Sequence, residues 1–285
     1  MASSDAFRGR TLLVATLHGK ERAIAPAFRE RLGVASVVAA AIDTDRFGAF
    51  SGEVARELDP RGAAEAKARA ALIEHGGELA IASEGSFVPH PAAPLLTLDE
   101  EWLVLVDARS ARVHVHRYAT LDAVFAARRC TSLEALLEFV ALQPFPEHAL
   151  VLRPRERWSA GEPVHKGIAE RGTIERLARD MLAAHGEVWV ETDLRAHCNP
   201  TRMRSIEHAA RSFADELATP CPRCSAPHFR VARSLPGLPC ADCAEPTDLA
   251  RALERRCDSC GLSLELPRPD GLPAADPAQC AACNP

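Results

Sequence analysis

The sequence predicts an α/β domain with a mixed sheet flanked by helices over residues 1–217, followed by a small cysteine-rich module over residues 218–285. Three observations lead to this fold class. Strand-like and helix-like stretches alternate through the first part. Eight of the ten cysteines gather between Cys221 and Cys283, and 285 residues exceed the usual size of one compact domain.

The first elements follow from the spacing of apolar residues. The apolar run over 11–16 is typical of a buried strand, and residues 37–42 have the same character. Between them, Ile24 and Phe28 share one face of a helix that we expect over 20–32. A strand, a helix and a strand in this order form the seed of an α/β sheet.

Helix boundaries and turn residues predict the remaining elements. Asp59 and Pro60 have the form of a cap and a first helical residue, and the alanine-rich helix that follows ends at His75. Residues 89–94, with three prolines, predict a stiff loop. Further strands are expected at 78–82, 102–106, 112–118, 148–152 and 188–191, with a hairpin across 108–111, and further helices at 131–142, 173–185 and 199–217.

The cysteines of the tail form four Cys-x-x-Cys knuckles: Cys221/Cys224, Cys240/Cys243, Cys257/Cys260 and Cys280/Cys283. Each knuckle presents two thiolates on one turn, so two knuckles supply the four sulfur ligands of a structural zinc ion. The knuckles are separated by 15, 13 and 19 residues, close to the spacing of zinc ribbons. The tail is therefore predicted to be a double zinc-ribbon module with two structural Zn²⁺ ions.

Two other uses of the cysteines are disulfides and a redox dithiol. No secretory signal is evident, and a thioredoxin-type motif would not recur four times. Consecutive knuckles can share a metal, or the first can pair with the third and the second with the fourth; we expect the consecutive pairing. A metal closed by four sulfurs holds a fold together and has no open position for chemistry.

Composition gives few hints about partners. With 47% hydrophobic residues, 26% charged residues and a net charge of −5, the chain has the composition of a soluble globular protein. The apolar run near the start is too short for a membrane span, and reduced thiols favour the cytoplasm. The tail has seven Arg and Lys against eight Asp and Glu, a poor balance for binding a phosphate backbone. Cys130 and Cys198 are expected to be ordinary small residues.

Polar residues gather where the predicted strands end, which is where open α/β sheets bind ligands. These residues are Thr16, His18 and Lys20; Asp43 and Asp45; Glu84 and Ser86; and Asp193, Arg195, Asn199 and Arg202. Carboxylates suit Mg²⁺, while lysine and arginine neutralise phosphate oxygens. The plainer interpretations are turn residues for Asp43 and Asp45, a solvated Lys20, and a helix cap with solvated arginines after Asp193.

Two families resemble this sequence. The motifs His18-Gly19-Lys20-Glu21, Asp43-Thr44-Asp45 with Phe50-Ser51-Gly52-Glu53, Ala82-Ser83-Glu84-Gly85-Ser86-Phe87 and Asn199-Pro200-Thr201-Arg202-Met203 resemble an uncharacterised bacterial domain family that often ends in cysteine knuckles. The first half is remotely similar to house-cleaning pyrophosphatases of the inosine-triphosphatase class. That similarity implies phosphate contacts from Thr16, His18, Lys20 and Lys67, and metal binding by Glu84 with Glu57 or Asp59.

The leading hypothesis is a Mg²⁺-dependent phosphohydrolase or pyrophosphatase acting on a nucleotide-like, phosphate-bearing small molecule. Catalysis is assigned to Glu84, Lys20 and Asp193, and substrate binding to Thr16, His18, Lys67, Ser86, Arg195, Asn199 and Arg202. The alternative is a non-catalytic zinc-ribbon protein that binds nucleic acid or a protein partner. Residues 195–212 carry four arginines against one glutamate, which keeps this alternative open. A third possibility is a structural subunit stapled by zinc.

Overall fold

The computed structural model describes residues 6–40, 58–91, 93–157 and 161–285. It divides into two compact units, one of residues 9–212 and one of residues 1–8 with 213–285. Helix α5 (Pro200–Ala218) runs from the first unit into the second. In the described part of the chain, no helix has the length and apolar character needed to cross a membrane.

The larger unit contains a five-stranded mixed sheet in the order β2-β1-β3-β4-β5. Strand β1 is parallel to β2 and β3, whereas β3, β4 and β5 form an antiparallel meander. The strands are β1 (Thr11–Ala15), β2 (Ala35–Val38), β3 (Leu79–His90), β4 (Ala93–Asp107) and β5 (Arg112–Thr120). The predicted mixed sheet with flanking helices is confirmed.

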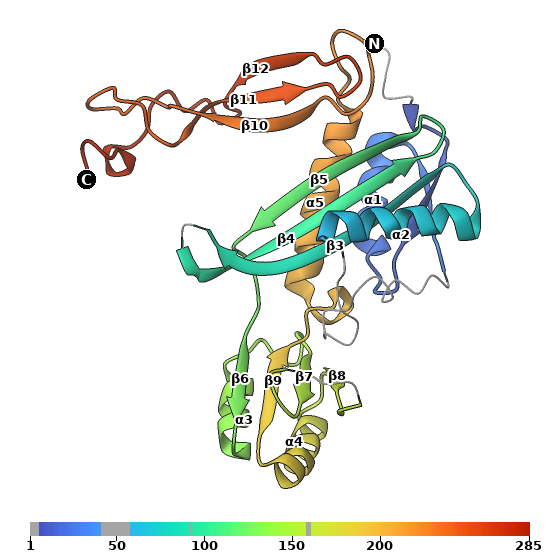
Figure 1. Ribbon diagram of the computed structural model, residues 1–285, viewed down its shortest axis with the longest axis vertical. Helices are drawn as coiled ribbons and strands as arrows, with labels where there is room; N and C mark the ends of the chain where they lie inside the picture. The colour runs from blue at the N-terminus through green and yellow to red at the C-terminus, as the bar shows by residue number, and fades with distance from the viewer. Residues whose placement is uncertain (1–5, 41–57, 92, 158–160) are drawn as a thin grey trace. The chain divides into compact units, whose positions relative to one another are not determined.

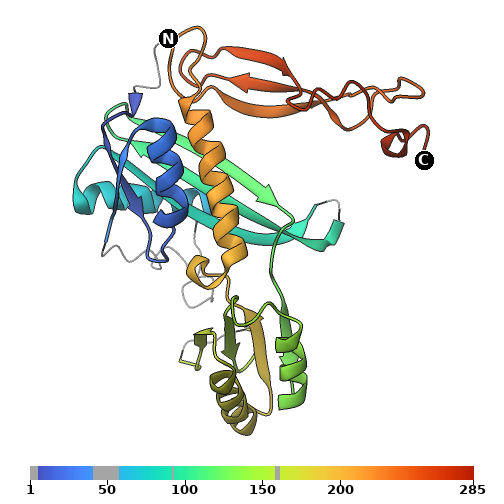
Figure 2. The same cartoon turned by 180° about the vertical axis from the view of Figure 1, so that it is seen from behind.

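Helices cover both faces of this sheet. Helix α2 (Pro60–His75) lies along one face, and α1 (Glu21–Leu32) and the first part of α5 lie on the other (Figure 1, Figure 2). Alanines of α2, including Ala64, Ala68 and Ala71, pack on β1 and β3 in a buried apolar cluster. The α2 start matches the prediction, since the carboxylate of Asp59 accepts from the Gly62 N–H at 2.6 Å and Pro60 is the first helical residue.

Strand β3 is much longer than the sequence predicted. It was expected to end at Ala82, but it continues to His90 because it pairs with β4 along its whole length, with one shift of register between Pro89 and His90. Residues 89–91 and 93–94 of the expected stiff loop therefore lie at the end of this hairpin. Its parallel neighbour β1 ends at Ala15, opposite Ala82. The polar residues Ser83 to Ser86 thus lie inside β3 but beyond the end of β1.

A second, four-stranded antiparallel sheet in the same unit has the order β6-β9-β7-β8. Its strands are β6 (Ala127–Cys130), β7 (Leu150–Arg153), β8 (His165–Ile168) and β9 (Val188–Thr192). Helices α3 (Leu133–Ala141) and α4 (Arg171–His185) share an apolar core with one face of it, through residues such as Leu136, Ile174, Leu150 and Val190. Strands β6 and β8 are too short to leave a periodic signal, and the sequence did not predict them.

The smaller unit is built on the antiparallel sheet β10-β11-β12: β10 (Arg230–Pro236), β11 (Ala250–Arg256) and β12 (Ser263–Pro267). Each knuckle closes with a backbone hydrogen bond from the residue after its second cysteine to the carbonyl of its first, as from Ser225 to Cys221. At Ser225, Ala244 and Gly261 this residue has a left-handed conformation. Such turns bring two sulfurs to the same side of the chain.

Candidate functional site

The turn between β1 and α1 positions the first group of polar residues. The hydroxyl oxygen of Thr16 accepts hydrogen bonds from the N–H groups of His18 (3.1 Å) and Lys20 (3.3 Å). Gly19 takes a left-handed conformation within the turn. Lys20 is buried, and its Nζ donates to the Ser83 carbonyl at 3.0 Å. The turn therefore carries the lysine to the part of β3 that extends past β1.

Two buried ion pairs lie on opposite faces of the sheet at this level. On the α2 face, Lys67 forms an ion pair with Glu84. On the α5 face, Nε of Arg202 donates to Oε1 of Glu101 at 2.6 Å. Glu84 and Gly85 are adjacent in β3, so they face opposite sides of the sheet. Glu101 of β4 is paired with Gly85 and therefore lies on the side opposite to Glu84.

Gly85 makes room for the Arg202–Glu101 pair. A Cβ at this position would lie 2.5 Å from a terminal guanidinium nitrogen of Arg202 and 2.6 Å from Oε1 of Glu101. Arg202 also donates to the Leu194 carbonyl at 2.5 Å. The glycine of the Ser-Glu-Gly-Ser segment is therefore explained by the close approach of an arginine from α5.

The charges of this cluster perturb one another. Burial, followed by the charge of Arg202, lowers the pKa of Lys20 to about 8, although Glu101 and Glu84 act in the opposite direction. Burial and the neighbouring Lys20 lower the pKa of His18 to about 3, so its ring is neutral at pH 7. Burial and the nearby Glu101 raise the pKa of Asp99 to about 7. Perturbed groups gathered in this way are a common feature of functional sites.

A pocket of about 570 Å³ opens beside His18. The rings of His18 and His197 stack within it, with centroids 4.8 Å apart and planes inclined by 21°. Its walls include Gly19 and Arg22 at the start of α1, and Pro200, Met203 and Arg204 at the start of α5. The first turns of two helices thus border one pocket, together with two arginine side chains. Helix N-termini present the positive end of the helix dipole to an anion. Several N–H groups of these two turns already have acceptors, since that of Lys20 donates to Thr16, that of Thr201 to His148 and that of Arg202 to Asn199. The dipoles and the arginines therefore provide the attraction.

Other predicted site residues have structural contacts away from this pocket. Asn199 caps α5, since its Oδ1 accepts from the Arg202 N–H at 3.0 Å and its Nδ2 donates to the Val124 carbonyl. The Ser86 hydroxyl donates to Glu100 at 3.4 Å, and Glu100 is paired with Arg117.

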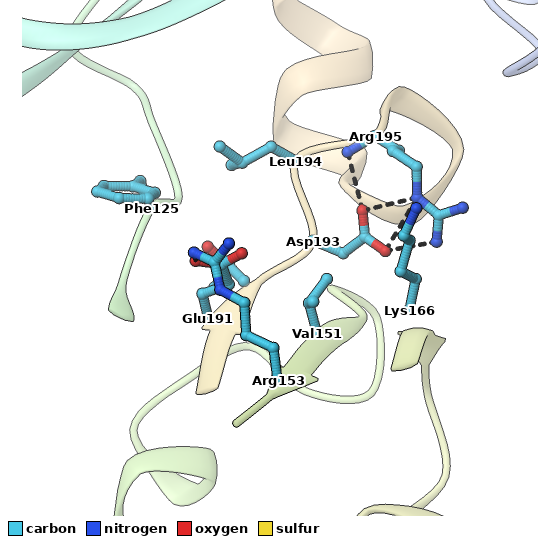
Figure 3. Close-up of a pocket in the computed structure, with 9 residues that line it drawn as sticks. Phe125, Val151, Arg153, Lys166, Glu191, Asp193, Leu194 and Arg195 are labelled. Atoms are coloured by element: carbon cyan, nitrogen blue, oxygen red, sulfur yellow. Dashed lines mark hydrogen bonds and ion pairs between the residues drawn. The ribbon is translucent and has the colours of Figure 1, made fainter. Parts of the chain in front are cut away.

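Asp193 and Arg195 line a separate cavity of about 100 Å³ at the end of the small sheet (Figure 3). Their side chains pair at 2.6 Å. Arg195 also contributes to the lowered pKa of His18, after burial, Lys20 and His197. The structure therefore brings Thr16, His18, Lys20, Lys67, Glu84 and Arg202 together and places Asp193 and Ser86 elsewhere. Asn199 adjoins the cluster as the cap of α5, where it accepts from the Arg202 N–H.

The carboxylates nearest the cluster do not form an open cation site among the described residues. Glu84 is paired with Lys67, Glu101 with Arg202, and Asp59 caps α2. The candidates Asp43, Asp45 and Glu57 lie outside the described residues. These residues thus give no basis for a Mg²⁺ ion held by the protein alone.

The eight tail cysteines form two groups of four, in each of which all sulfurs lie within 4.8 Å of one another: Cys221, Cys224, Cys257 and Cys260; and Cys240, Cys243, Cys280 and Cys283. In each group two pairs of sulfurs from different knuckles are 3.6 to 3.8 Å apart, among them Cys221 with Cys260 and Cys240 with Cys283. Four sulfurs at a Zn–S distance of about 2.3 Å in a tetrahedron would be roughly 3.8 Å apart. Both groups therefore have dimensions that suit a metal ion. Among the described residues, no other cluster of three or more His, Cys, Asp or Glu side chains is arranged to hold one.

The knuckles are paired first with third and second with fourth, so the expected consecutive pairing is wrong. The strand directions explain the correction. Arg230 at the start of β10 faces Arg256 at the end of β11, so the knuckles at 221 and 257 lie at one end of the sheet. Between each knuckle and the next, the chain runs along one strand from one end of the sheet to the other. The knuckles at 240 and 280 therefore lie at the end of the sheet opposite to the knuckles at 221 and 257.

The arginines of the tail are largely neutralised. Arg230 pairs with Asp258, Arg233 with Glu254, Arg251 with Glu265 and Arg268 with Asp270. Pairing of this kind weakens the attraction for a phosphate backbone. These ion pairs therefore give no support for a nucleic-acid interface on the smaller unit.

Three residues of the site were not predicted from the sequence: Arg22, Asp99 and Glu101. A usable signal existed for two of them, because Asp99 and Glu101 alternate along β4 in step with the buried Leu103 and Leu105. Polar residues at core-facing positions of a strand are exceptions that call for partners. Arg22 follows no such pattern, since it is an ordinary polar residue near a helix start, whereas Arg204 belongs to the arginine-rich start of the last predicted helix.

Fold and site together define an α/β domain with a buried charge cluster, joined to a tail with two tetracysteine groups. The chain belongs to the family described as "Domain of unknown function (DUF6671)", whose model matches residues 67–285. A comparison with functionally curated proteins gave no match.

Among solved structures, one similar chain is described as "Crystal structure of protein VC0702 from Vibrio cholerae". It is 11% identical, with a TM-score of 0.31, and the match covers 71% of this chain and 92% of that one. A similarity this distant carries no argument about function.

Proposed function

We propose that the α/β domain binds the magnesium complex of a nucleotide-like, phosphate-bearing small molecule and hydrolyses one of its phosphate bonds. The observation that supports this most is the pocket beside His18, which the first turns of α1 and α5 border together with Arg22 and Arg204. Helix N-termini and arginines are the groups that proteins use for phosphate. Magnesium belongs to the substrate in this proposal, because Glu84 and Glu101 are already paired and the described residues contain no cluster of carboxylates arranged to hold a metal ion.

The reaction we propose is attack of a water molecule on phosphorus, with departure of phosphate or pyrophosphate. Arg22 and Arg204 would contact phosphate oxygens. The positive charge of Lys20, which is buried next to the pocket, would stabilise the negative charge that develops on these oxygens during the reaction. The His18 ring has a low pKa, so it is neutral and can accept a hydrogen bond from the attacking water. Glu84 and Lys67 would act indirectly, by fixing β3 beside Lys20.

Turnover of nucleoside triphosphates is the direct test. We expect the protein to release phosphate or pyrophosphate from a member of a nucleotide panel in the presence of Mg²⁺. Arg204→Gln should lower kcat/KM by about 10²-fold, as loss of a charge-stabilising donor does in other enzymes. Arg176→Gln is the control, because Arg176 lies on α4 in an exposed pair with Asp180 and neither residue lines the pocket. Equal activity in the two variants, or no turnover of any nucleotide, would contradict the proposal.

Substrate affinity should fall at alkaline pH because of Lys20. Its pKa of about 8 means that it carries a positive charge below that pH and loses it above. An anion is held less tightly by the neutral amine, so the dissociation constant of the magnesium–nucleotide complex should rise as pH passes through this value. Calorimetric titrations one pH unit below and one above give the change. In Lys20→Met this step should be absent, and a step that persists in the variant would assign it to another group.

We also propose that both tetracysteine groups hold Zn²⁺, in a reducing compartment such as the cytoplasm where thiolates persist. The spacing of the sulfurs supports this assignment. With four sulfur ligands each, these ions would stabilise the tail and take no part in hydrolysis.

A further inference from the structure

The pocket beside His18 changes in chemical character along helix α5. One stripe of this helix lines it, made of Pro200, Met203, Arg204 and Glu207. Residues three, four and seven positions apart share a face of a helix. With a rise of about 1.5 Å per residue, Glu207 lies about 10 Å along the helix axis from Pro200. The pocket therefore extends from the positive end of the helix to a carboxylate two turns further on.

The two charged side chains of this stripe turn away from each other. Arg204 donates to the Thr201 hydroxyl oxygen at 3.0 Å, toward the start of the helix. Glu207 accepts from Arg211 at 2.9 Å, one turn nearer the helix end. Both hydrogen bonds that Arg211 donates go to Oε1 of Glu207, so within the described part of the chain its Oε2 is still able to accept. Positive and negative groups are thus separated along the pocket wall.

The size and lining of the pocket suit a nucleobase as well as phosphates. Its volume of about 570 Å³ is typical of sites for small molecules. Met203, one turn before Glu207, and Leu17, which is 48% exposed, give the wall apolar surface. Proteins hold a base against apolar side chains and recognise it by hydrogen bonds to its Watson–Crick edge. Because ribose separates base from phosphates, phosphates at the helix start leave the base near Met203 and Glu207.

A carboxylate on the wall selects among the bases, because it carries acceptors and no donor. Glu207 is the acidic side chain among the described residues that line the pocket. Guanine presents two adjacent donors on its Watson–Crick edge, N1–H and the N2 amino group. Adenine and cytosine each present one amino group beside a ring nitrogen that accepts, and uracil presents one N–H between two carbonyls. Guanine therefore matches both oxygens of a carboxylate, while the other bases place an acceptor against it.

We propose that the substrate is a guanine nucleotide and that Glu207 recognises its base. This inference rests on the proposed function and names the class of nucleotide for the same pocket. The N1–H and the N2 amino group would donate to the two oxygens of Glu207, while the phosphates lie at the helix starts beside Arg22 and Arg204. Arg211 already holds the carboxylate, so little side-chain freedom is lost when the base binds.

The ratio of two affinities tests the base preference. Calorimetry on the full-length, zinc-loaded protein would use the magnesium complexes of the β,γ-methylene analogues of GTP and ATP, which resist hydrolysis between those phosphates. The GTP analogue should bind about tenfold tighter or more, as expected for hydrogen bonds to a charged group. Glu207→Gln should bring the two affinities close together, because an amide donates as well as accepts. Arg204→Gln should weaken both analogues alike and preserve their ratio.

Glu175→Gln is the matched control. Glu175 pairs with Arg179 on α4 in the same i,i+4 arrangement, and it does not line the pocket, so this variant should keep the guanine preference. Nucleotide turnover with equal affinity for the two analogues, or a preference that Glu207→Gln leaves unchanged, overturns this inference while the proposed hydrolysis stands. A guanine preference that Glu207→Gln removes, without turnover of any nucleotide, supports the inference and counts against the hydrolase alone. Failure to bind either analogue overturns both.

Discussion

Replacing Cys221 and Cys257 together is expected to remove one metal ion from the protein, whereas replacing Cys221 and Cys240 removes both. The first two cysteines belong to the same group of four, and the second two belong to different groups. Native mass spectrometry of the serine variants would count the ions. Consecutive pairing of the knuckles predicts the reverse result, with both ions lost in Cys221→Ser/Cys257→Ser and one in Cys221→Ser/Cys240→Ser. Cys130→Ser is the control and should keep both.

The same variants should unfold the tail around the lost metal. The apolar cluster there is small, with Phe229 packed against Cys221 and Cys257. Binding of a structural zinc ion provides about 10–16 kcal/mol of folding free energy in small domains, far more than such a cluster. Hydrogen exchange should therefore show loss of protection in β10 to β12 of the variants and after chelation. Protection that persists in these strands without metal would show that the sheet is stable by itself.

Local signals predicted the helices well, because caps and apolar spacing act within a few residues. Asp59 and Pro60 set the start of α2, and the spacing of Ile24 and Phe28 revealed α1. Strand lengths were harder to predict. The polar residues Ser83 to Ser86 look like a loop, but β4 supplies partners for their backbone groups, and this pairing is a property of the whole sheet.

The knuckle pairing was mispredicted for a related reason. Spacing along the chain indicates that a metal site exists, while strand direction decides which knuckles meet. Each interval between knuckles contains one strand or a crossing of the sheet, so successive knuckles end at opposite ends. A count of crossings could have predicted the pairing that the structure has.

The candidate site was partly predictable. Lys20 comes near Glu84 because β1 and β3 are parallel neighbours, so that Lys20 follows the end of β1 while Glu84 lies where β3 extends beyond that end. Asp193 follows a strand of the other sheet, and no local pattern in the sequence reveals that a second sheet exists. Glu101 stands at a core-facing position of β4 and could have been predicted to need a partner, but that partner, Arg202, lies 101 residues away and leaves no local signal.

Arg202→Met is expected to lower the free energy of unfolding by about 3–5 kcal/mol, because it leaves the buried Glu101 carboxylate without its partner. Urea denaturation gives the value. Adding Glu101→Gln should recover part of the loss, since the uncompensated charge is removed. Arg211→Met, which breaks an exposed pair on the same helix, should cost about 1 kcal/mol or less. A similar cost for Arg202→Met and Arg211→Met would mean that the buried pair contributes little.

Gly85→Ala should act on the same ion pair from the other side. The added Cβ would lie within 2.6 Å of both charged groups, so Arg202 and Glu101 would have to separate.

Gly85→Ala and Arg202→Met should both also shift the pKa of Lys20. Arg202 is the largest charge effect that lowers the pKa of this lysine, while Glu101 raises it. In Arg202→Met the pKa of Lys20 should therefore rise above about 8, and the alkaline loss of nucleotide affinity should move to higher pH. An unchanged pH midpoint in a folded Arg202→Met protein would separate the buried pair from the phosphate pocket and leave it a structural role alone.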